Sequence, residues 1–546
     1  MERKAWPEAC KAYAYGMMLI DRLYYRQVLA KFKFSWLRQA NDLVENAAYA
    51  LAKIGRLADA VLTLEQGRTR TLDEALSRQE VVAKAVSTVD LDAYKAVSQR
   101  IVDLEAELRL TDQPGGRDKV FITAELRQTH DLLQAIVARV HNNVPNLMPQ
   151  ELSLSEITAL ADTLYQPLVY LITTSQGSLA LIVLLSRQAA TAAVTAVWLD
   201  DFDRSDLANI LYDHENTHRY LHGTVFGHLA LLRSVLDSIW TTLDQKLMAK
   251  LISHLHLLDG RRAMLIPTGT LALLPLHAVA LDAMTFQYIP SARALYTVLN
   301  DKDHISRPLT FLGIGNPLNR RQQSLAFARI EVEKVATLFD EAKLHYLIYC
   351  EEEATRQHLV TYLPGTTHLH FSCHGRFDVY DPLRSALYLA GDDTLTLHNL
   401  LDGSLDVSAV RLAVLSACQT GITDFQSVPD EAIGFPAGFL QAGIPGVVST
   451  LWSVDELSTA LLMNEFYRQH LKAEREPADA LRQAQLWLRE ATAEEMKLAG
   501  YYEQLYIDAG RRDREAFQWM NYYRANPTVK PFAHPYYWAG FVFSGV

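Results

Sequence analysis

Two stretches of the sequence each place a reactive side chain just past an apolar run. THLHFSCHGRFD contains His374, and VRLAVLSACQTG contains Cys418. A thiol needs a nearby base to become a good nucleophile at neutral pH, and an imidazole meets that need. If both runs are parallel strands of one α/β sheet, their carboxyl ends lie at the edge where such sheets bind ligands. The pattern therefore predicts Cys418 as a nucleophile and His374 as its general base, 44 residues apart in the chain.

Gly375 follows the histidine directly, so no side chain blocks its backbone N–H from a reacting carbonyl oxygen. Together with the N–H of Cys418, it is predicted to form an oxyanion hole. A lone cysteine after an apolar strand is more commonly a core residue than a nucleophile. The combination of a Cys and a His-Gly, each at the polar end of a strand and in this order, favours a cysteine peptidase of the caspase class.

A zinc site is the first alternative, because Cys373 adjoins His374 and lies near His368 and His370. Side chains alternate along a strand, so residues 368, 370, 372 and 374 share one face and Cys373 points to the other, into core. The compact motif CxxC is absent from the sequence, and none of these residues belongs to an HExxH motif. We therefore expect neither a metal site nor a nucleophilic role for Cys373.

Two other enzyme classes have weaker support. FLGIGNP, residues 311–317, places glycines after an apolar strand but lacks the third glycine of GxGxxG and the GK[ST] of a P-loop, and Pro317 interrupts the turn. A GxSxG elbow is also absent, which disfavours a serine hydrolase. No organic cofactor is expected.

From about residue 150 onward, short apolar β runs alternate with helical segments, which is typical of an α/β domain. Several runs are continuously apolar, as expected for parallel strands covered on both faces. The predicted strands are Pro167 to Thr174, Leu179 to Leu185, Ala193 to Leu199, Ala263 to Ile266, Pro308 to Gly313, Leu344 to Cys350, His368 to Ser372, Leu412 to Ser416 and Gly446 to Leu451.

The preceding part of the chain has a helical pattern. Ala50 to Gln66 places Gly55 between two amphipathic segments, which predicts a helix-turn-helix unit. It is similar to one tetratricopeptide repeat, but no second copy follows at a 34-residue period, so an ordinary helical hairpin stays open as an interpretation. Leu91 to Leu110 and Val120 to His141, separated by the breakers of TDQPGGRD, predict a long antiparallel hairpin.

The bulk composition fits a multidomain globular protein. A chain of 546 residues exceeds the size at which one hydrophobic core stops growing. A net charge of −11 disfavours general nucleic-acid or anionic-membrane binding and makes a protein partner the better expectation. The apolar stretch from Pro167 to Leu185 is interrupted by TTSQGS, which predicts a hairpin rather than a membrane span. Four cysteines without close pairing and no secretory signal favour a cytoplasmic location.

Longer stretches resemble the CHAT peptidase family, a caspase- and separase-like group often fused to tetratricopeptide repeats. They are HLHFSCHGRFD, VLSACQTG, DEAIGFPAGFLQAGIPGVVSTLWSVDE and HPYYWAGFVFSG, with weaker echoes in MLIPTGTLALLPLHAVAL, YIPSARAL and FLGIGNP. The resemblance spans about residues 150 to 546 and maps the family's histidine, glycine and cysteine onto His374, Gly375 and Cys418. In this class the histidine is often oriented by backbone, and no third triad member is evident.

The resemblance implies a caspase-like, mostly parallel sheet with flanking helices after an all-α region. We expect a tetratricopeptide-like helical part (1–90), a long helical hairpin or linker (91–150), a pseudo-caspase half without cysteine (151–305) and an active half (306–546). The predicted function is limited cleavage of a protein partner, with partner binding at the N-terminal helices regulating it. The alternative is a catalytically silent scaffold.

Candidates for the substrate pocket are Asp430, Glu431, Trp452 and Asp455, which follow the nucleophile at or beyond strand ends. In the separase-like relatives, an acid at the position of Asp455 lies near the side chain that precedes the cut, which would favour a basic residue there. Asp455 can instead cap the helix ELSTALLMNEFY, because Asp is a favoured N-cap. We favour the capping interpretation, with Trp452 and apolar neighbours bounding the pocket.

Overall fold

The structure is a computed structural model of the 546-residue chain. It describes residues 5–25, 37, 42–68, scattered residues between 92 and 107, and then 118–143, 152–188, 193–212, 219–225, 229–258, 260–300, 308–378, 381–402, 404–423 and 433–546.

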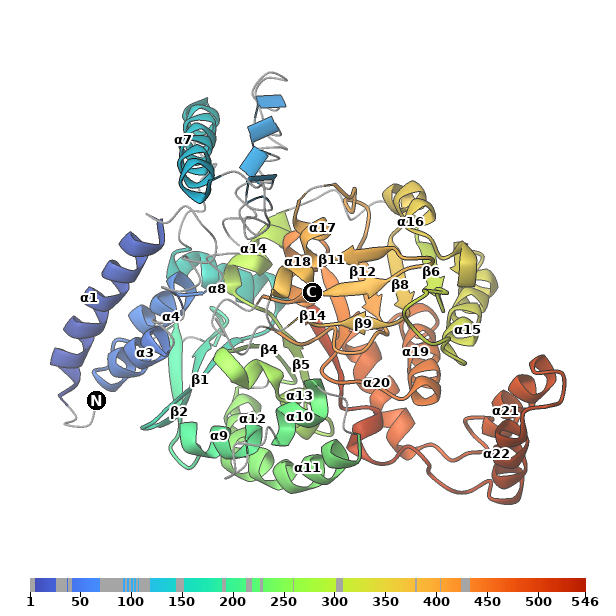
Figure 1. The fold of residues 1–546 in the computed structure, drawn as a ribbon. Helices are drawn as coiled ribbons and strands as arrows, with labels where there is room; N and C mark the ends of the chain where they lie inside the picture. Colours follow the sequence, from blue (N-terminus) through green and yellow to red (C-terminus); the bar gives the residue numbers. More distant parts are fainter. Residues whose placement is uncertain are drawn as a thin grey trace.

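Within the described residues, an eleven-stranded sheet runs through the body in the order β3-β2-β1-β4-β5-β14-β13-β12-β8-β6-β7 (Figure 1). All nine apolar runs predicted as strands are strands, and β5 and β14 are additional. The strands are β1 (Leu168–Thr174), β2 (Gly177–Val183), β3 (Val194–Leu199), β4 (Arg262–Pro267), β5 (Thr285–Tyr288), β6 (Thr310–Gly315), β7 (His345–Cys350), β8 (His368–Ser372), β12 (Leu412–Leu415), β13 (Gly446–Thr450) and β14 (Phe541–Gly545). A small second sheet contains β9 (Gly375–Arg376), β10 (Ala386–Tyr388) and β11 (Thr394–Thr396).

The large sheet consists of two parallel blocks that run in opposite directions. In the first block, β1, β4 and β5 are parallel, and in the second block β13, β12, β8, β6 and β7 are parallel. β14 joins them, because it pairs parallel to β5 and antiparallel to β13. The carboxyl ends of the two blocks therefore lie at opposite edges of the sheet.

Helices cover both faces of the sheet, which confirms the predicted fold class. One buried cluster lies along the whole of one face and includes side chains of α9 to α13, α15, α19 and α20. The other face has two clusters, one under α17 and α18 and one under α3, α4, α8 and α14. Bounds of these helices are α3 (Leu43–Lys53), α4 (Leu57–Gln66), α8 (Leu154–Leu164), α9 (Arg204–Leu211), α10 (Arg219–Val225), α11 (Leu229–Thr242), α12 (Ala249–Leu257), α13 (Leu276–Val279), α14 (Ala292–Asn300), α15 (Ala328–Glu341), α17 (Leu397–Leu401), α18 (Phe435–Gln441), α19 (Glu456–Leu471) and α20 (Pro477–Glu490).

The predicted helix-turn-helix unit is confirmed as α3 and α4, with Gly55 at φ 79° in the turn between them. A positive φ of this size costs glycine little, and it reverses the chain between the two helices. The unit packs on the first block, where the Tyr49 hydroxyl donates to the carbonyl of Gln176 at 2.9 Å. The carboxylate of the half-buried Glu65 accepts hydrogen bonds from the Tyr170 hydroxyl (2.8 Å) and from the N–H of Ala292 (2.9 Å), at the start of α14.

Two further helices precede the first strand in the chain and lie away from the sheet: α1 (Trp6–Tyr25) and α7 (Lys119–Asn143) (Figure 1). The helix predicted for Val120 to His141 corresponds to α7. Ile101 and Leu104 of the preceding run are buried, and Arg100 forms an ion pair with Glu125 of α7. This pairing fits the predicted hairpin, whose connection at residues 111–117 lies outside the described residues.

The predicted β-hairpin between residues 167 and 185 is also confirmed, since β1 and β2 pair antiparallel with Thr174 opposite Gly177. Every residue of both strands is buried. In the part of the chain that the structure describes, no helix combines the length and the apolar character that a membrane crossing requires.

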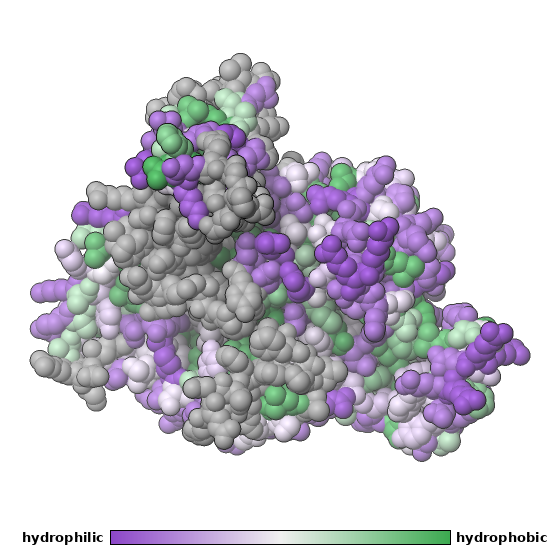
Figure 2. Space-filling model, viewed as in Figure 1, coloured by the Kyte–Doolittle hydropathy of each residue, from purple (hydrophilic) through white to green (hydrophobic). Residues whose placement is uncertain are grey.

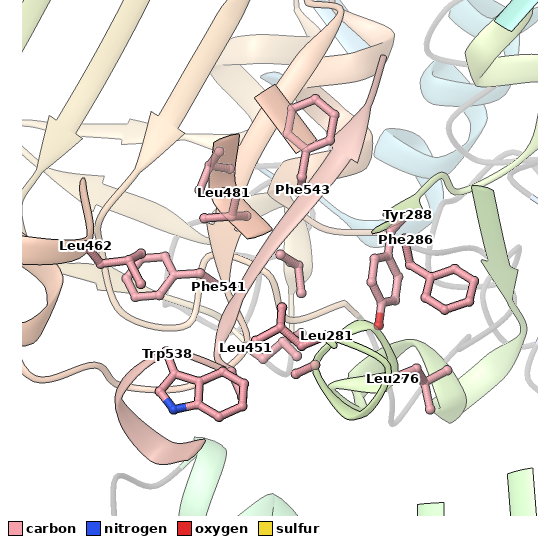
Figure 3. Close-up of a cluster of buried hydrophobic side chains, with 14 of the residues drawn as sticks. Leu276, Leu281, Phe286, Tyr288, Leu451, Leu462, Leu481, Trp538, Phe541 and Phe543 are labelled. Carbon is pink, nitrogen blue, oxygen red and sulfur yellow. The ribbon is translucent and has the colours of Figure 1, made fainter. Parts of the chain in front are cut away.

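The junction around β14 is a dense apolar cluster between the blocks (Figure 3). Phe541 and Phe543 of β14 and Trp538 just before it lie among side chains of the first block, such as Phe286. Leu451, Leu462 and Leu481 approach from the second block, α19 and α20. Because the cluster draws on residues far apart in sequence, it makes the two blocks one packed body.

α21 (Leu498–Asp508) and α22 (Arg514–Ala525), which lie between α20 and β14 in the sequence, form a helical hairpin that projects from the body (Figure 1). Its exposed apolar side chains include Phe517, Trp519 and Tyr522. Elsewhere on the face shown in Figure 2, the described surface is mostly hydrophilic, with apolar residues in small groups.

Candidate active site

The ends of β8 and β12 bring the two predicted catalytic segments together. These strands are parallel neighbours with His368 opposite Leu412 and Phe371 opposite Leu415, an offset of 44 residues. The ladder continues one step further, because the N–H of Ser416 donates to the carbonyl of Phe371 at 2.9 Å. His374 and Cys418, which share this 44-residue offset, follow the two strands at the carboxyl edge of the second block.

Gly375 packs directly on the backbone of the cysteine loop. A Cβ at this position would lie 2.8 Å from the carbonyl oxygen of Cys418 and 3.2 Å from the Cβ of Ala417. Contacts this short exclude any side chain without movement of the backbone. Gly375 therefore lies close to the Cys418 carbonyl, while the oxyanion hole formed by the two N–H groups stays a prediction.

His374 is half-buried, and its orientation is set by a backbone carbonyl. Nε2 lies 2.7 Å from the carbonyl oxygen of Gln323, in the segment between β6 and α15. A carbonyl oxygen only accepts, so Nε2 carries the proton and Nδ1 keeps a lone pair when the ring is neutral. The ring is thus in the tautomer that leaves Nδ1 as the base.

The loop that carries Cys418 is fixed by hydrogen bonds to the end of β13. The carbonyl of Ala417 accepts from the Thr450 hydroxyl at 2.6 Å, and the N–H of Gly421 donates to the carbonyl of Thr450 at 2.7 Å. Gln419 has φ 63°, a left-handed conformation that is uncommon for a residue with a side chain. These contacts make a sharp turn directly after β12, which lifts Cys418 out of the strand.

The surroundings of the thiol favour its neutral form at rest. Burial raises the pKa of the Cys418 thiol, while the N–H of Val454 and the side chain of Ser453 lower it by hydrogen bonding. Part of the residue is nonetheless exposed to solvent. A neutral thiol of this kind needs a base to remove its proton when a substrate binds.

Glu456, which the sequence reasoning did not single out, also faces the site. Its carboxylate accepts from the N–H of Phe327 at 3.3 Å. Burial raises the pKa of this carboxyl, whereas the hydrogen bonds from Phe327 and Ala326 and the nearby imidazole of His374 lower it. The acidic pair in LWSVDE was the available signal, but the sequence alone does not show which acid of the pair faces the histidine.

The four pocket candidates have different positions. Asp430 and Glu431 lie outside the described residues. Trp452 is fully buried, donates from Nε1 to the carbonyl of Tyr536 at 3.0 Å, and lies in the core rather than at a rim. Asp455 is the N-cap of α19, where its side chain accepts from the N–H of Ser458 at 2.9 Å.

The residues of the zinc alternative are separated. Cys373 lies in the apolar cluster of the opposite face, where burial raises the pKa of its thiol. His368 faces His470, with 3.2 Å between their Nε2 atoms. Among the residues that the structure describes, no three His, Cys, Asp or Glu side chains are grouped to hold a metal ion.

A buried polar network lies beneath the two strand ends, and the sequence reasoning missed it. His370 Nε2 lies 2.8 Å from one Glu331 carboxylate oxygen, and the Ser372 hydroxyl donates to the other at 2.9 Å. His370 Nδ1 lies 3.3 Å from the Tyr467 hydroxyl. The network connects β8 with α15 and α19, and so fixes the strand that leads into His374.

With this geometry in view, the chain can be assigned to a family. The sequence profile of the CHAT domain family matches residues 237–546, which is more than half of the chain. The protein belongs to the CHAT domain family. No curated protein sequence matches the chain.

Solved structures of cysteine peptidases are similar at low identity. The Arg-specific cysteine proteinase gingipain R has 9% identity and a TM-score of 0.32, covering 57% of this chain and 67% of that chain. The complex of the Porphyromonas gingivalis RgpB pro- and mature domains has 10% identity and a TM-score of 0.29, covering 58% and 70%. The Saccharomyces cerevisiae separase–securin complex has 11% identity and a TM-score of 0.35, covering 87% of this chain and 46% of that chain.

Proposed function

We propose that the protein is a cysteine endopeptidase that cuts a protein partner at a limited number of sites. His374 accepts the proton of Cys418, the thiolate attacks the peptide carbonyl, and the N–H groups of Gly375 and Cys418 hold the oxyanion. The protonated imidazole then protonates the leaving amine, and water hydrolyses the thioester.

The observation that carries this proposal is the contact between the His-Gly segment and the cysteine loop. In support of this proposal, His374 and Cys418 follow neighbouring parallel strands, and a Cβ on Gly375 would lie 2.8 Å from the Cys418 carbonyl oxygen. The hydrogen bond from Nε2 to the Gln323 carbonyl supplies the tautomer with a basic Nδ1. General-base catalysis by such a group contributes about 10²- to 10⁴-fold in rate.

The second candidate function is a catalytically silent scaffold. It is favoured by the thiol, whose pKa is raised by burial and which therefore stays protonated at neutral pH without a base. In this function the helical region binds a partner and the sheet only supports it. The two functions differ in whether Cys418 reacts with a substrate-like electrophile.

The test is labelling of the full chain with a peptide acyloxymethyl ketone, followed by peptide mapping. We expect modification at Cys418 that is lost in Cys418→Ala and in His374→Ala and retained in Cys373→Ala. Cys373→Ala is the matched control, because it removes a neighbouring thiol from the opposite face of β8. Absence of labelling in every state, including with partners present, would favour the scaffold.

We also propose that the chain is divided into domains at 1–90, 91–150, 151–305 and 306–546. Partner binding at the N-terminal helices of the first domain would regulate the peptidase. The α3–α4 unit packs on one face of the first block and reaches the ends of β1 and β4 through Tyr49, Glu45 and Arg68, whereas His374 and Cys418 follow strands of the second block. Regulation of this kind acts through the sheet rather than by covering the site. Co-expression with proteins encoded by neighbouring genes, followed by mapping of new N-termini, would identify the activator and the cleavage rule together.

A further inference from the structure

The segment from Asn316 to Phe327 connects β6 to α15 and carries the carbonyl that orients His374. Apart from a single bridge at Asn319, it has no strand or helix hydrogen bonding to fix its course. The position of the Gln323 carbonyl must therefore come from specific contacts of its neighbours. A loop that orients a catalytic base needs such contacts, because misplacement by about 1 Å can cost about 100-fold in rate.

Asn316 makes these contacts from the end of β6. Its Oδ1 accepts from the N–H of Leu325 at 2.8 Å, and its Nδ2 donates to the Ser324 hydroxyl at 3.0 Å. Both partners follow Gln323 directly in sequence. The side chain thus uses its acceptor and its donor on the two residues next to the orienting carbonyl.

The backbone of Asn316 is joined to the histidine strand as well. Its N–H donates to the carbonyl of Ser372 at 2.9 Å, two residues before His374. Asn316 is 6% exposed and has φ 45°, a left-handed conformation that asparagine tolerates better than most residues with a side chain. One residue therefore bridges the strand that bears the base and the loop that orients it.

We infer that Asn316 is a positioning residue for the catalytic base, holding the Gln323 carbonyl where it binds Nε2 of His374. This inference rests on the proposed function and assigns a task to the FLGIGNP motif, which as a phosphate loop was incomplete. Asparagine suits the task because it offers one acceptor and one donor on a short side chain and adopts a positive φ.

Three substitutions separate these properties. Asn316→Gly keeps the left-handed backbone without strain and removes both side-chain hydrogen bonds. Asn316→Asp keeps the acceptor for the Leu325 N–H and loses the donor. Asn319→Ala is the matched control, because Asn319 lies in the same loop, is 7% exposed, and bonds the Leu389 carbonyl at 2.9 Å and the N–H of Arg321 at 3.0 Å without contacting Ser324 or Leu325.

The experiment measures the rate of Cys418 alkylation by iodoacetamide against pH on the full chain, resolved by peptide mass spectrometry. This readout requires no knowledge of the substrate. In Asn316→Gly we expect alkylation at pH 7 to be about 10-fold slower, with the pH profile moved toward that of His374→Ala. Asn316→Asp should lie between that variant and wild type, and Asn319→Ala should match wild type.

The outcomes distinguish failure of the positioning role of Asn316 from failure of the Cys418–His374 dyad. A wild-type profile in Asn316→Gly, with an altered profile in His374→Ala, overturns the positioning role and leaves the dyad intact. An equal shift in Asn319→Ala also overturns it, since any disturbance of the loop would then suffice. A wild-type profile in His374→Ala overturns the dyad and the inference with it. Urea unfolding of each variant separates these results from a loss of folded protein.

Discussion

The carboxyl ends of the parallel strands have different surroundings in the two blocks of the sheet. In the first block, the end of β4 is closed by the N-terminal unit: the buried Arg68 donates to the Pro267 carbonyl at 3.0 Å, and the Thr268 hydroxyl donates to the buried Glu45. In the second block, the corresponding edge carries His374 and Cys418, both partly exposed.

Within the described residues, the two edges therefore differ in whether a helical unit packs on them. Both edges offer the loops and helix starts at which α/β proteins bind ligands. In the first block, that position holds a helical hairpin whose Glu45 and Glu65 carboxylates have structural partners. In the second block, the polar groups at the edge are oriented by one another and by a loop, and solvent reaches them.

The first prediction tests whether the two blocks fold as one body despite their different edges. Phe541→Ala removes a fully buried ring from the junction and should lower the free energy of unfolding by about 3–5 kcal/mol. Urea unfolding followed by fluorescence measures this loss. Phe517→Ala, on the 44% exposed side chain of α22, is the control and should change it by less than about 0.5 kcal/mol. Separate transitions for the two blocks in the wild type would contradict the single body.

The second prediction concerns the glycine contact of the open edge. Gly375→Ala places a Cβ 2.8 Å from the Cys418 carbonyl and should slow labelling of Cys418 by about 100-fold, the size of a lost oxyanion donor. Gly365→Ala, where no atom lies within 4 Å of an added Cβ, is the matched control. Labelling kinetics with the acyloxymethyl ketone distinguish them, and equal rates would exclude a close-packed site at Gly375.

The third prediction uses one buried histidine from each block. Burial lowers the pKa of His277 to about 4 and that of His368 to about 3, and the neighbouring His470 adds to the second effect. The unfolded chain protonates near pH 6.5, so stability is full above that pH and is lost as pH falls toward about 3 to 4. At pH 5, each histidine should account for a loss of about 2 kcal/mol.

Urea midpoints at pH 7.5 and 5.0 measure this loss. His277→Gln and His368→Gln should each remove a similar share of the pH dependence, since the effect follows from burial and not from the block. An unchanged pH dependence in both variants would show that other groups cause the acid sensitivity.

The fourth prediction addresses the closed edge. Glu65→Gln keeps the shape of the side chain but removes the charge that faces the N–H groups at the start of α14. Loss of this charge-assisted contact should lower the free energy of unfolding by about 1 kcal/mol. Glu494→Gln, on an exposed side chain, should leave the urea midpoint unchanged. A neutral result for Glu65→Gln would mean that apolar packing alone holds the α3–α4 unit in place.

Sequence reasoning predicted the elements whose signal is local. Most of the nine apolar runs are strands buried on both faces, whereas β7 at the end of the sheet is exposed or half-buried, and Gly55 ends a helix because of its positive φ. The position of β14 in the sheet could not be predicted from the sequence. Its pairing with β5 joins Ser544 to Tyr288, two residues that lie far apart in the chain. No pattern within a short window specifies such a partner.

The same division holds for the site. His374, Gly375 and Cys418 follow predicted strands, so the strand prediction alone assigned them to the same edge of the sheet. The inferred role of Gln323 depends on its backbone carbonyl, and that of Asn316 on its left-handed backbone and on contacts with a distant loop. Neither feature can be recognised from the type of the residue. For Trp452, burial under Gly540 and Tyr536 depends on a segment more than 80 residues away.

The central position of β14 also sets an order for synthesis. Before residues 541–545 leave the ribosome, the first block and the second block each present an unpaired edge strand, β5 and β13. Such edges are prone to wrong pairing with other chains. The surroundings of Cys418 are also incomplete at this stage, because the Tyr536 hydroxyl donates to the carbonyl of Ser453 at 3.2 Å, and the Ser453 side chain hydrogen-bonds to the Cys418 thiol. A nascent chain therefore completes the contacts around this thiol only after the segment that leads into β14 is in place.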